Sequence, residues 1–403
     1  MQIIKIKGNK MNRIRSIILS SAITLIVATL IFSMVIKKDS NNQSLSFSSL
    51  FNATASSYTQ RQPVNSEITT ERQNIITKTV AHISPAVVGI TVTEIRQYRN
   101  VWSADPFWRQ FFGDRVYNQQ IKSLGSGTII SPDGYIITND HVAGNAIEAI
   151  VTLTDGSQYS AKVIGTDHSS DICLLKIEAK NLPYVEFGNS DEIMIGEWVI
   201  AFGNPFGLFD INDKPTVTVG VVSANGMNIG SVDNRFYVNM LQTDAAINSG
   251  NSGGPLVNAI GELIGMNTII FTAQGSSGNV GVSFAIPINK INRIIGELKS
   301  KGKVERDFWT GLKILTINEQ IAKTYKLSSS RGVIITEVEK NSPAQKAGLQ
   351  VEDIIIGVDG FRINDENTLG GLIQEYRTGD TVDFKILRDN KQLIKKMKLE
   401  KMK

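Results

Sequence analysis

Cysteine is almost absent from this chain of 403 residues, which contains only Cys173. A single cysteine excludes an intramolecular disulfide, so the fold depends on its core and not on covalent cross-links. Cys173 lies in the apolar run 172–177, which predicts a small side chain of the core. Because oxidising compartments permit disulfides without requiring them, the low count is compatible with a location outside the cytoplasm.

Acidic residues are missing from the first 38 positions, which contain seven Lys and Arg. The net charge of +4 therefore reflects this segment, and the remainder carries about −3. A slightly negative net charge outside this segment does not indicate a nucleic-acid partner. Charge of either sign is missing from residues 17–36, a stretch of twenty residues.

This uncharged stretch has the length of a membrane-spanning helix, roughly 20 residues. A secretory signal peptide has a shorter apolar region, about 7–15 residues, before a small-residue cleavage site. We therefore expect an uncleaved signal anchor at 17–36, with a cleaved signal peptide as the alternative. Five basic residues before the stretch and two after it predict a cytoplasmic N-terminus, with the body of the protein on the other side.

Glycine is concentrated around one serine, because residues 250–255 read Gly-Asn-Ser-Gly-Gly-Pro. Glycine permits backbone angles that side chains forbid, so Ser252 can lie on a tight turn with an accessible Oγ. Such a turn also directs the backbone N–H groups of Gly250, Asn251 and Ser252 toward a point where an oxyanion can be held. The alternative is an ordinary loop between strands, since such clusters are also common turn chemistry.

Histidine is scarce, and one of the three, His141, follows an apolar stretch at 135–138. This pattern predicts a strand that presents the imidazole at its rim. Asp171 directly precedes the apolar run 172–177. A serine hydroxyl needs a neutral imidazole as its base, and the imidazole needs a carboxylate that fixes its tautomer. The order His141, Asp171, Ser252 is that of chymotrypsin-type enzymes.

Three other residues compete for these roles. His82 lies where a helix is expected to lead into the first strand, which indicates packing or a surface position. His168 is only three residues before Asp171, so we expect it to be a loop residue. Asp167 is the rival orienting carboxylate, but it does not directly precede the apolar run.

Several separate blocks match one known family in sequence and spacing. They are Thr-Asn-Asp-His-Val at 138–142, Ser-Asp-Ile-Cys-Leu-Leu-Lys-Ile at 170–177, Ala-Phe-Gly-Asn-Pro-Phe-Gly at 201–207, Gln-Thr-Asp-Ala-Ala-Ile-Asn-Ser-Gly-Asn-Ser-Gly-Gly-Pro at 242–255 and Phe-Ala-Ile-Pro at 284–287. Together they resemble the HtrA (Deg) serine proteases. The resemblance implies an endopeptidase with His141, Asp171 and Ser252 as catalytic residues and with neither a cofactor nor a metal.

The same resemblance implies a mainly β fold. A chymotrypsin-like protease domain of two six-stranded β-barrels would be followed by one α/β PDZ domain and preceded by the transmembrane helix. Short β-branched runs separated by turn signals agree with barrels. Residues expected to line the substrate pocket are Ile247, Met266, Thr268 and Ile269. Expected domains are 1–16 (cytoplasmic), 17–36 (anchor), 37–72 (flexible linker), 73–303 (protease) and 304–403 (PDZ).

The C-terminal hundred residues resemble a PDZ domain through Asn-Ser-Pro-Ala at 341–344 and Gly-Leu-Gln-Val-Glu-Asp-Ile-Ile at 348–355. Such a domain binds the C-terminus of a peptide by strand addition, and backbone N–H groups hold the carboxylate. The corresponding residues are Trp309, Thr310, Gly311 and Leu312. Members of the family usually carry a bulky apolar residue where Thr310 stands.

One anchor, one protease domain and one PDZ domain resemble the DegS type more than the soluble members with two PDZ domains. This implies a homotrimer in the inner membrane, with its folded domains in the periplasm. It would cleave a membrane-bound anti-sigma factor or misfolded envelope proteins, activated by C-terminal peptides of misfolded outer-membrane proteins. The alternative from another class is a chaperone-like scaffold with little turnover.

Two loops are candidates for regulation. The segment 101–118 is rich in aromatic residues, which indicates either local packing or contact with a neighbouring subunit. The loop 225–237 precedes the Ser252 segment and is the expected relay from the PDZ domain. Arg235 is its candidate contact to that domain or to another subunit, and the alternative is a solvated charge.

Overall fold

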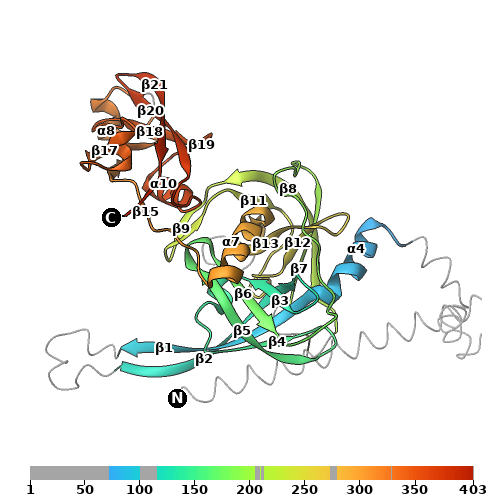
Figure 1. Ribbon diagram of the computed structural model, residues 1–403. Coiled ribbons are helices and arrows are strands. Elements are labelled where there is room, and N and C mark those ends of the chain that lie inside the picture. Colours follow the sequence, from blue (N-terminus) through green and yellow to red (C-terminus); the bar gives the residue numbers. More distant parts are fainter. Residues whose placement is uncertain are drawn as a thin grey trace, which may run out of the picture. The chain divides into compact units, whose positions relative to one another are not determined.

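The short β-branched runs of residues 87–287 close into two β-barrels (Figure 1). The computed structural model describes residues 72–99, 116–204, 209, 213–272, 279–327 and 329–402. Helix α4 (Ile75–Ile83), capped by Asn74, and the turn η1 (Ser84–Ala86) lead into the first barrel. Its order is β1-β2-β3-β6-β5-β4, with β1 (Val87–Arg99), β2 (Val116–Ile129), β3 (Tyr135–Thr138), β4 (Glu148–Thr152), β5 (Gln158–Asp167) and β6 (Ile172–Ile177).

The second barrel has the order β11-β14-β13-β12-β7-β8. Its strands are β7 (Trp198–Gly203), β8 (Thr216–Met227), β11 (Met240–Thr243), β12 (Pro255–Asn258), β13 (Leu263–Thr272) and β14 (Asn279–Pro287). The expectation of two six-stranded barrels is therefore confirmed. Between β8 and β11 the chain forms a separate hairpin of β9 (Gly230–Val232) and β10 (Arg235–Tyr237).

The β9–β10 hairpin replaces part of the loop expected at 225–237. Its two-residue turn, Asp233 and Asn234, has φ angles of 50° and 59°. Asp and Asn tolerate this left-handed region better than other residues with side chains, and such turns match the twist of paired strands. The segment that the sequence analysis treated as a loop is thus an ordered strand pair.

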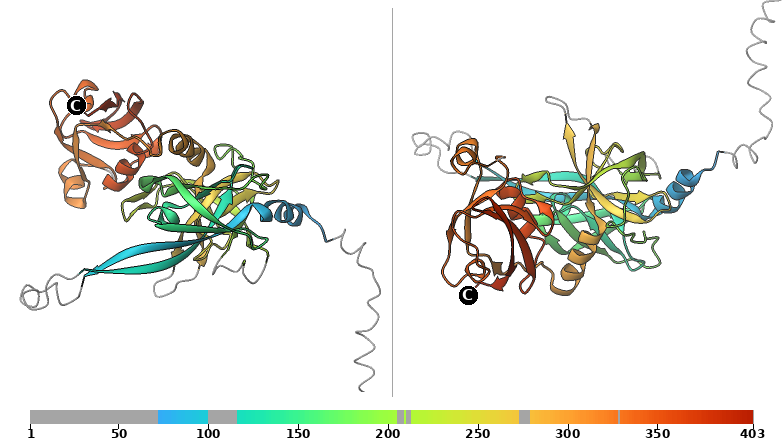
Figure 2. Two further views of the ribbon diagram at one scale, coloured as in Figure 1. Left: turned by 60° about the horizontal axis from the view of Figure 1, so that its bottom comes forward. Right: turned by 90° about the horizontal axis from the view of Figure 1, so that it is seen from above.

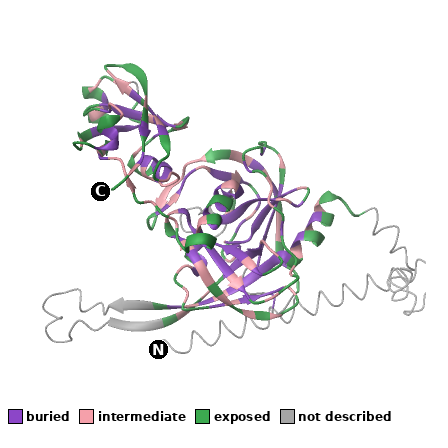
Figure 3. Ribbon diagram, viewed as in Figure 1, coloured by how far each residue is buried: buried purple, intermediate pink, exposed green. Residues whose placement is uncertain are grey.

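Both barrels contain many buried residues (Figure 3), and most of them are apolar. In β6 five of six residues are buried, which explains why this strand reads as a continuous apolar run. Each fully buried Leu or Ile contributes roughly 1.5–3 kcal/mol relative to exposure. Cys173 is among the buried residues, as predicted, and burial raises the pKa of its thiol to about 12.

A mixed α/β domain follows the second barrel (Figure 2, orange to red). Helix α7 (Ile288–Lys301) ends at Gly302, which adopts the left-handed conformation with φ 72°. The sheet has the order β16-β17-β18-β20-β21, with β19 beside β18, and β15 pairs with β22. The elements are β15 (Phe308–Trp309), β16 (Leu312–Thr316), α8 (Glu319–Thr324), β17 (Val333–Val338), α9 (Pro343–Lys346), β18 (Ile354–Val358), β19 (Phe361–Arg362), α10 (Glu366–Ile373), β20 (Thr381–Arg388), β21 (Lys391–Lys398) and β22 (Glu400–Lys401).

Two segments that the sequence analysis singled out fall wholly or largely outside the described residues. The expected anchor at 17–36 is one of them, and among the residues described no helix is both long and apolar enough to cross a membrane. Of the aromatic segment 101–118, only 116–118 are described, and they belong to β2. The expected loop is therefore shorter at this end, because pairing with β1 continues to Val116.

Ion pairs connect the C-terminal domain to the barrels and α7. The Arg306 guanidinium, between α7 and β15, donates to both oxygens of Asp167 at 2.6 and 2.7 Å. Burial opposes ionisation of Asp167, but the hydrogen bonds from Arg306 outweigh it and lower the pKa of this carboxyl. Further pairs join Arg377 to Glu297, and Lys290 and Arg293 to Glu375.

We predict that the Asp167–Arg306 pair makes the free energy of unfolding depend on pH. Because the folded-state pKa of Asp167 is lowered, its contribution is complete above the ordinary Asp range of about 4. It is lost as the pH falls through the lower folded value. Asp167→Asn should reduce the free energy of unfolding at pH 7 by about 3 kcal/mol, since it leaves a buried guanidinium without its counter-ion.

Urea unfolding of both proteins between pH 2 and pH 7 measures this effect, with the exposed Asp191→Asn as the control. The stability of Asp167→Asn should change less with pH than that of the wild type. Equal pH dependence in the two proteins would contradict the prediction.

Candidate active site

Asp171 is a fully buried carboxylate at the start of β6. It follows the short turn η3 (His168–Ser170) and has left-handed backbone angles, φ 58° and ψ 43°. Residues with side chains adopt this region rarely, and Asp is among those that do so most readily. The turn ends the preceding strand and aims the carboxylate at His141.

Asp171 accepts hydrogen bonds from several segments of both barrels. His141 Nδ1 lies 2.8 Å from Oδ2, and the His141 backbone N–H donates to Oδ1 at 3.0 Å. The side chains of Asn139, Tyr237 and Thr268 approach Oδ2 at 3.2, 3.2 and 2.8 Å. Burial opposes ionisation, but the hydrogen bonds from His141 and Thr268 outweigh it, so the pKa of Asp171 is below its ordinary value.

His141 lies in the first turn of a short helix, α6 (Asp140–Ala143), directly after β3. The expectation that a strand presents the imidazole at its rim is therefore corrected: the strand ends at Thr138 and the helical turn holds the ring. Asn139 precedes the helix without a side-chain cap and instead donates its amide to Asp171. Because Nδ1 faces Asp171, a neutral His141 ring presents Nε2 as the acceptor.

Ser252 lies on a turn that the first barrel helps to hold. Gly250 and Gly253 on either side have φ angles of 93° and 86°, which only glycine adopts without strain. The Ser126 hydroxyl donates to the Gly250 carbonyl at 2.6 Å, and the Ser126 N–H donates to the Ser252 carbonyl at 3.0 Å. Ser126 is fully buried in β2, so the serine turn is fixed against the opposite barrel.

The Ser252 hydroxyl donates to the Thr268 carbonyl at 3.0 Å, and no hydrogen bond joins it to His141, although both residues are described. Proton transfer to His141 therefore requires a change of the Ser252 rotamer. Catalytic hydrogen bonds often form only in the complex with substrate, so this geometry is compatible with a nucleophile.

Two backbone N–H groups of the turn are available to a ligand. Neither Gly250 nor Ser252 donates its N–H to any residue that the structure describes. The Asn251 N–H, which the sequence analysis also assigned to an oxyanion hole, donates to the Asn248 carbonyl at 3.0 Å. Asn251 is thus corrected to a residue that closes the turn, because its donor is already used.

The four residues expected in the substrate pocket differ from one another in their surroundings. Ile247 and Met266 are buried in the apolar cores of the second barrel. Thr268 is used on both sides, since its hydroxyl donates to Asp171 and its carbonyl accepts from Ser252. Thr268 therefore orients the polar groups of the site, and its place in the substrate pocket stays a prediction. Ile269 lies in β13, and its side chain is outside the described part.

The residues that competed for the roles of base and orienting carboxylate lie in other surroundings. His82 lies in α4. The Asp167 carboxylate faces Arg306. His168 Nδ1 lies 2.8 Å from Asp140 Oδ2, and its Nε2 lies 2.9 Å from the Asp233 carbonyl.

Sequence reasoning missed several residues around the site. Ser126 and Tyr237 contact it directly, and Asp140 is buried beside His141. Arg235 was proposed as a contact to the PDZ domain or another subunit, but its guanidinium pairs with Asp140 at 2.7 Å and Asp171 at 3.3 Å. The alternation of polar and apolar residues at 235–238 was the available signal for a strand with two different faces.

The C-terminal domain has a small hollow of about 140 Å³ between β16 and α10. Thr310 and Leu312, two of the four expected peptide-binding residues, line it, whereas Trp309 and Gly311 do not. The carbonyls of Thr310 and Gly311 accept hydrogen bonds from Ala344 and Glu339. The hollow is also lined by Ile314, Leu369, Gly370 and Ile373.

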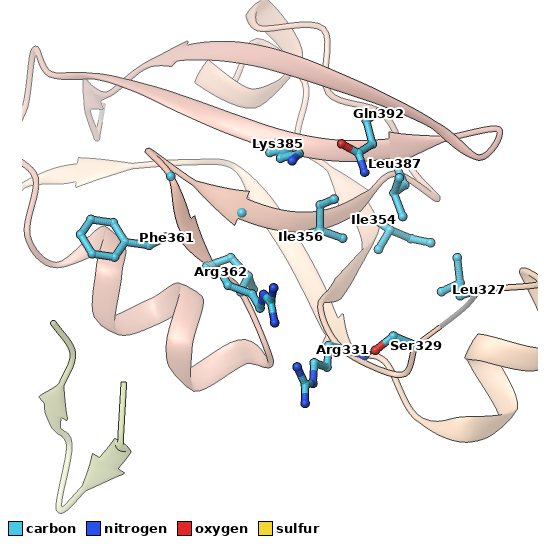
Figure 4. A pocket seen from close by; sticks show the side chains of 13 residues that line it. Leu327, Ser329, Arg331, Ile354, Ile356, Phe361, Arg362, Lys385, Leu387 and Gln392 are labelled. Atoms are coloured by element: carbon cyan, nitrogen blue, oxygen red, sulfur yellow. Dashed lines mark hydrogen bonds between the residues drawn. The ribbon is translucent and has the colours of Figure 1, made fainter. Parts of the chain in front are cut away.

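A larger hollow of about 580 Å³ in the same domain lies over β18, β19 and β20 (Figure 4). Ile354, Ile356 and Leu387 give it an apolar wall. Arg331 and Arg362 lie together at its lower edge in this view. It contains no acid, base or nucleophile arranged for catalysis, and it is separate from the hollow beside α10.

Comparisons with known proteins agree with both domains. Residues 125–266 match the family model of the trypsin-like peptidase domain, and residues 311–399 match that of the PDZ domain. A "Probable periplasmic serine endoprotease DegP-like" of Chlamydia muridarum is 45% identical over 71% of this chain, but the match spans only 57% of that relative's length. A protein of the same name from Marinomonas sp. is 42% identical over 78% of this chain and 69% of its own.

A solved structure described as the HtrA-type protease AlgW with decapeptide is also similar. It is 34% identical, with a TM-score of 0.59, and the match covers 81% of this chain and 99% of that one. With a peptidase domain, a PDZ domain and relatives of this identity and coverage, the chain belongs to the HtrA-type serine protease family.

Proposed function

We propose that the protein is a serine endopeptidase in which Ser252 is the nucleophile, His141 the general base and Asp171 the residue that orients His141. One observation carries this proposal: the buried Asp171 carboxylate holds the His141 ring, and the N–H groups of Gly250 and Ser252 in the glycine turn donate to no residue that the structure describes. The family's relatives, named as serine endoproteases, support the same activity.

The geometry suggests how each group acts. Ser252 Oγ leaves the Thr268 carbonyl, transfers its proton to His141 Nε2 and attacks the peptide carbonyl carbon. The N–H groups of Gly250 and Ser252 hold the resulting oxyanion. His141 then returns the proton to the leaving amine, and water hydrolyses the acyl-enzyme by the same route. Asp171 stabilises the imidazolium throughout, which requires that it stays ionised, in agreement with its lowered pKa.

The hollow between β16 and α10 is the proposed site of a peptide C-terminus. Peptides bind PDZ domains beside this strand and helix by strand addition. Support comes from the apolar lining of Leu312, Ile314 and Leu369, together with the AlgW structures described as having a decapeptide or tripeptide. Binding there would activate the peptidase, with C-terminal segments of misfolded outer-membrane proteins as the ligands.

A periplasmic location at the inner membrane completes the proposal. The relatives are named as periplasmic, and the charge pattern around residues 17–36 favours a retained anchor. A DegS-type homotrimer that cleaves a membrane-bound anti-sigma factor or misfolded envelope proteins would fit this domain order, with boundaries near 72 and 303.

The catalytic assignment predicts that Ser252→Ala abolishes hydrolysis of unfolded β-casein. Loss of the nucleophile should lower kcat by about 10⁴–10⁶-fold, because the remaining binding groups cannot replace it. Asp171→Asn should cost on the order of 10⁴-fold, since the amide favours the wrong tautomer of His141. Asp167→Asn is the matched control, four residues away but paired with Arg306, and its kcat should stay within a few-fold of the wild type.

Equal losses in Asp167→Asn and Asp171→Asn would overturn the choice of orienting carboxylate. Near-normal cleavage by purified Ser252→Ala would overturn the choice of nucleophile.

The peptide site predicts a dependence on the free carboxylate. A decapeptide with an apolar C-terminal residue should raise kcat of the full chain by about 5–150-fold, the usual range of coupling between two sites. The same peptide with a C-terminal amide should have little effect, because backbone N–H groups lose their anionic partner. Equal activation by both peptides would exclude recognition of a C-terminus.

The anchor predicts that residues 17–36 remain in the mature protein. N-terminal sequencing of the protein from the membrane fraction tests this expectation. A mature N-terminus between residues 39 and 57 would mean that the segment is a cleaved signal peptide.

A further inference from the structure

The peptide unit that joins Gly250 to Asn251 lies between the two free donors of the serine turn. These donors, the N–H groups of Gly250 and Ser252, belong to the peptide units on either side of it. Each unit is a rigid plane, so rotation about the bonds that flank this middle unit changes the angle between the two donors. Whatever fixes the middle unit therefore decides whether the donors converge on one oxyanion.

Both polar groups of the middle unit are held by hydrogen bonds. The Asn251 N–H donates to the Asn248 carbonyl at 3.0 Å, within the turn itself. The Gly250 carbonyl accepts from the Ser126 hydroxyl at 2.6 Å, and Ser126 lies 124 residues earlier, in strand β2 of the first barrel. Glycine populates many backbone regions, so Gly250 does not define the direction of its own carbonyl. The Ser126 hydroxyl supplies that constraint.

A third segment directs the proton of the Ser126 hydroxyl toward Gly250. The hydroxyl oxygen accepts from the backbone N–H of Asn204, directly after β7, at 2.7 Å. A hydroxyl has one proton and two lone pairs, and a backbone N–H can only donate, so the proton is left for the Gly250 carbonyl. Ser126 is fully buried and Asn204 is 2% exposed, so bulk water does not compete for either bond.

The backbone of Ser126 is fixed independently of its hydroxyl. Its N–H donates to the Ser252 carbonyl at 3.0 Å, and its own carbonyl accepts from the Thr138 hydroxyl at 2.7 Å. The turn comes this close because glycine faces β2: a Cβ built at Gly253 would lie 2.2 Å from the Ser126 carbonyl oxygen, closer than side chains allow. An apolar residue at 126 would keep these backbone bonds and lose only the bond to the Gly250 carbonyl.

We propose that Ser126 is a positioning residue for the oxyanion hole. Its hydroxyl holds the middle peptide unit so that the N–H groups of Gly250 and Ser252 converge on the oxyanion of the substrate. Without the hydroxyl, the Gly250 carbonyl loses its partner and the unit turns, while the nucleophile and its base stay in place. The inference rests on the proposed function and adds a residue of the opposite barrel to the groups that stabilise the transition state.

The test uses the full chain with β-casein as substrate. Ser126→Ala removes the hydroxyl. Ser123→Ala is the matched control, because it makes the same substitution in the same strand, at a half-buried residue with no hydrogen bond to the serine turn among the residues described. A peptide boronic acid is the second probe: boron bonds to Ser252 Oγ, the hydroxyl proton passes to His141, and the tetrahedral anion resembles the transition state.

Ser126→Ala should lower kcat by about ten- to a hundred-fold with little change in KM. The loss should be smaller than the roughly 10²–10³-fold that follows removal of an oxyanion donor, because both N–H groups remain and are only misdirected. The pH profile of kcat/KM should keep its shape, since the hydroxyl binds neither His141 nor Asp171. Ser123→Ala should match the wild type.

The boronic acid separates positioning from a loss of folded protein. Its affinity for Ser126→Ala should fall by a factor similar to the fall in kcat/KM, because both report binding of the transition state. A smaller folded fraction alone would lower kcat and leave the affinity of the remaining sites unchanged.

A wild-type kcat in Ser126→Ala would overturn the proposal, and so would a lowered kcat with wild-type affinity for the boronic acid. If Ser126→Ala does not fold, as judged by circular dichroism, Ser126→Cys decides, because the thiol is a weaker donor of similar size. Its kcat and its affinity should both lie below those of the wild type, and unchanged values would overturn the proposal. A wild type that does not cleave β-casein would instead contradict the proposed function.

Discussion

The buried charge of Asp171 is the constraint on which the rest of the site depends. A carboxylate without solvent is strongly unfavourable unless several donors surround it. Here the donors come from three separate segments: His141 and Asn139 after β3, Tyr237 in β10, and Thr268 in β13. They belong to both barrels and to the hairpin, so the charge is stable only when all of these are packed together. Folding and assembly of the candidate site are thus the same event.

Three aspartates lie within this small region, and arginines separate their roles. Arg306 neutralises Asp167 and ties it to the segment before the PDZ domain. Arg235 neutralises Asp140 and also pairs with Asp171. Only Asp171 directs a carboxylate at the His141 ring. Like charges in one region repel one another, and a positive side chain beside each carboxylate offsets this repulsion. The pairing with arginine therefore protects the ionised state that a general base requires beside it.

The serine turn does not depend on a buried charge, because its geometry is set by the backbone. Glycines at 250 and 253 supply the positive φ angles, and Ser126 fixes two carbonyls of the turn from the first barrel. A small buried hydroxyl can donate to one carbonyl and accept from Asn204 at once, which an apolar residue could not do. The candidate nucleophile and the candidate base are therefore supported by separate sets of contacts.

The glycine turn could be predicted from its own residues, because glycine is required at its positive φ angles. The two barrels and the pairing of His141 with Asp171 were predicted through the resemblance of several motifs to a known family, and the β-branched runs agreed with it. The sequence did not predict the roles of Ser126, Tyr237 and Arg235 at the site. Their roles arise from contacts between residues far apart in the chain, such as Ser126 with Gly250, which no local pattern encodes. The Asn251 N–H was misassigned to the oxyanion hole for the same reason, since only the packed structure decides which of a residue's donors is already used. Which groups the two faces of β10 contact depends on the register of the hairpin and on the approach of α10. Both are features of the tertiary structure.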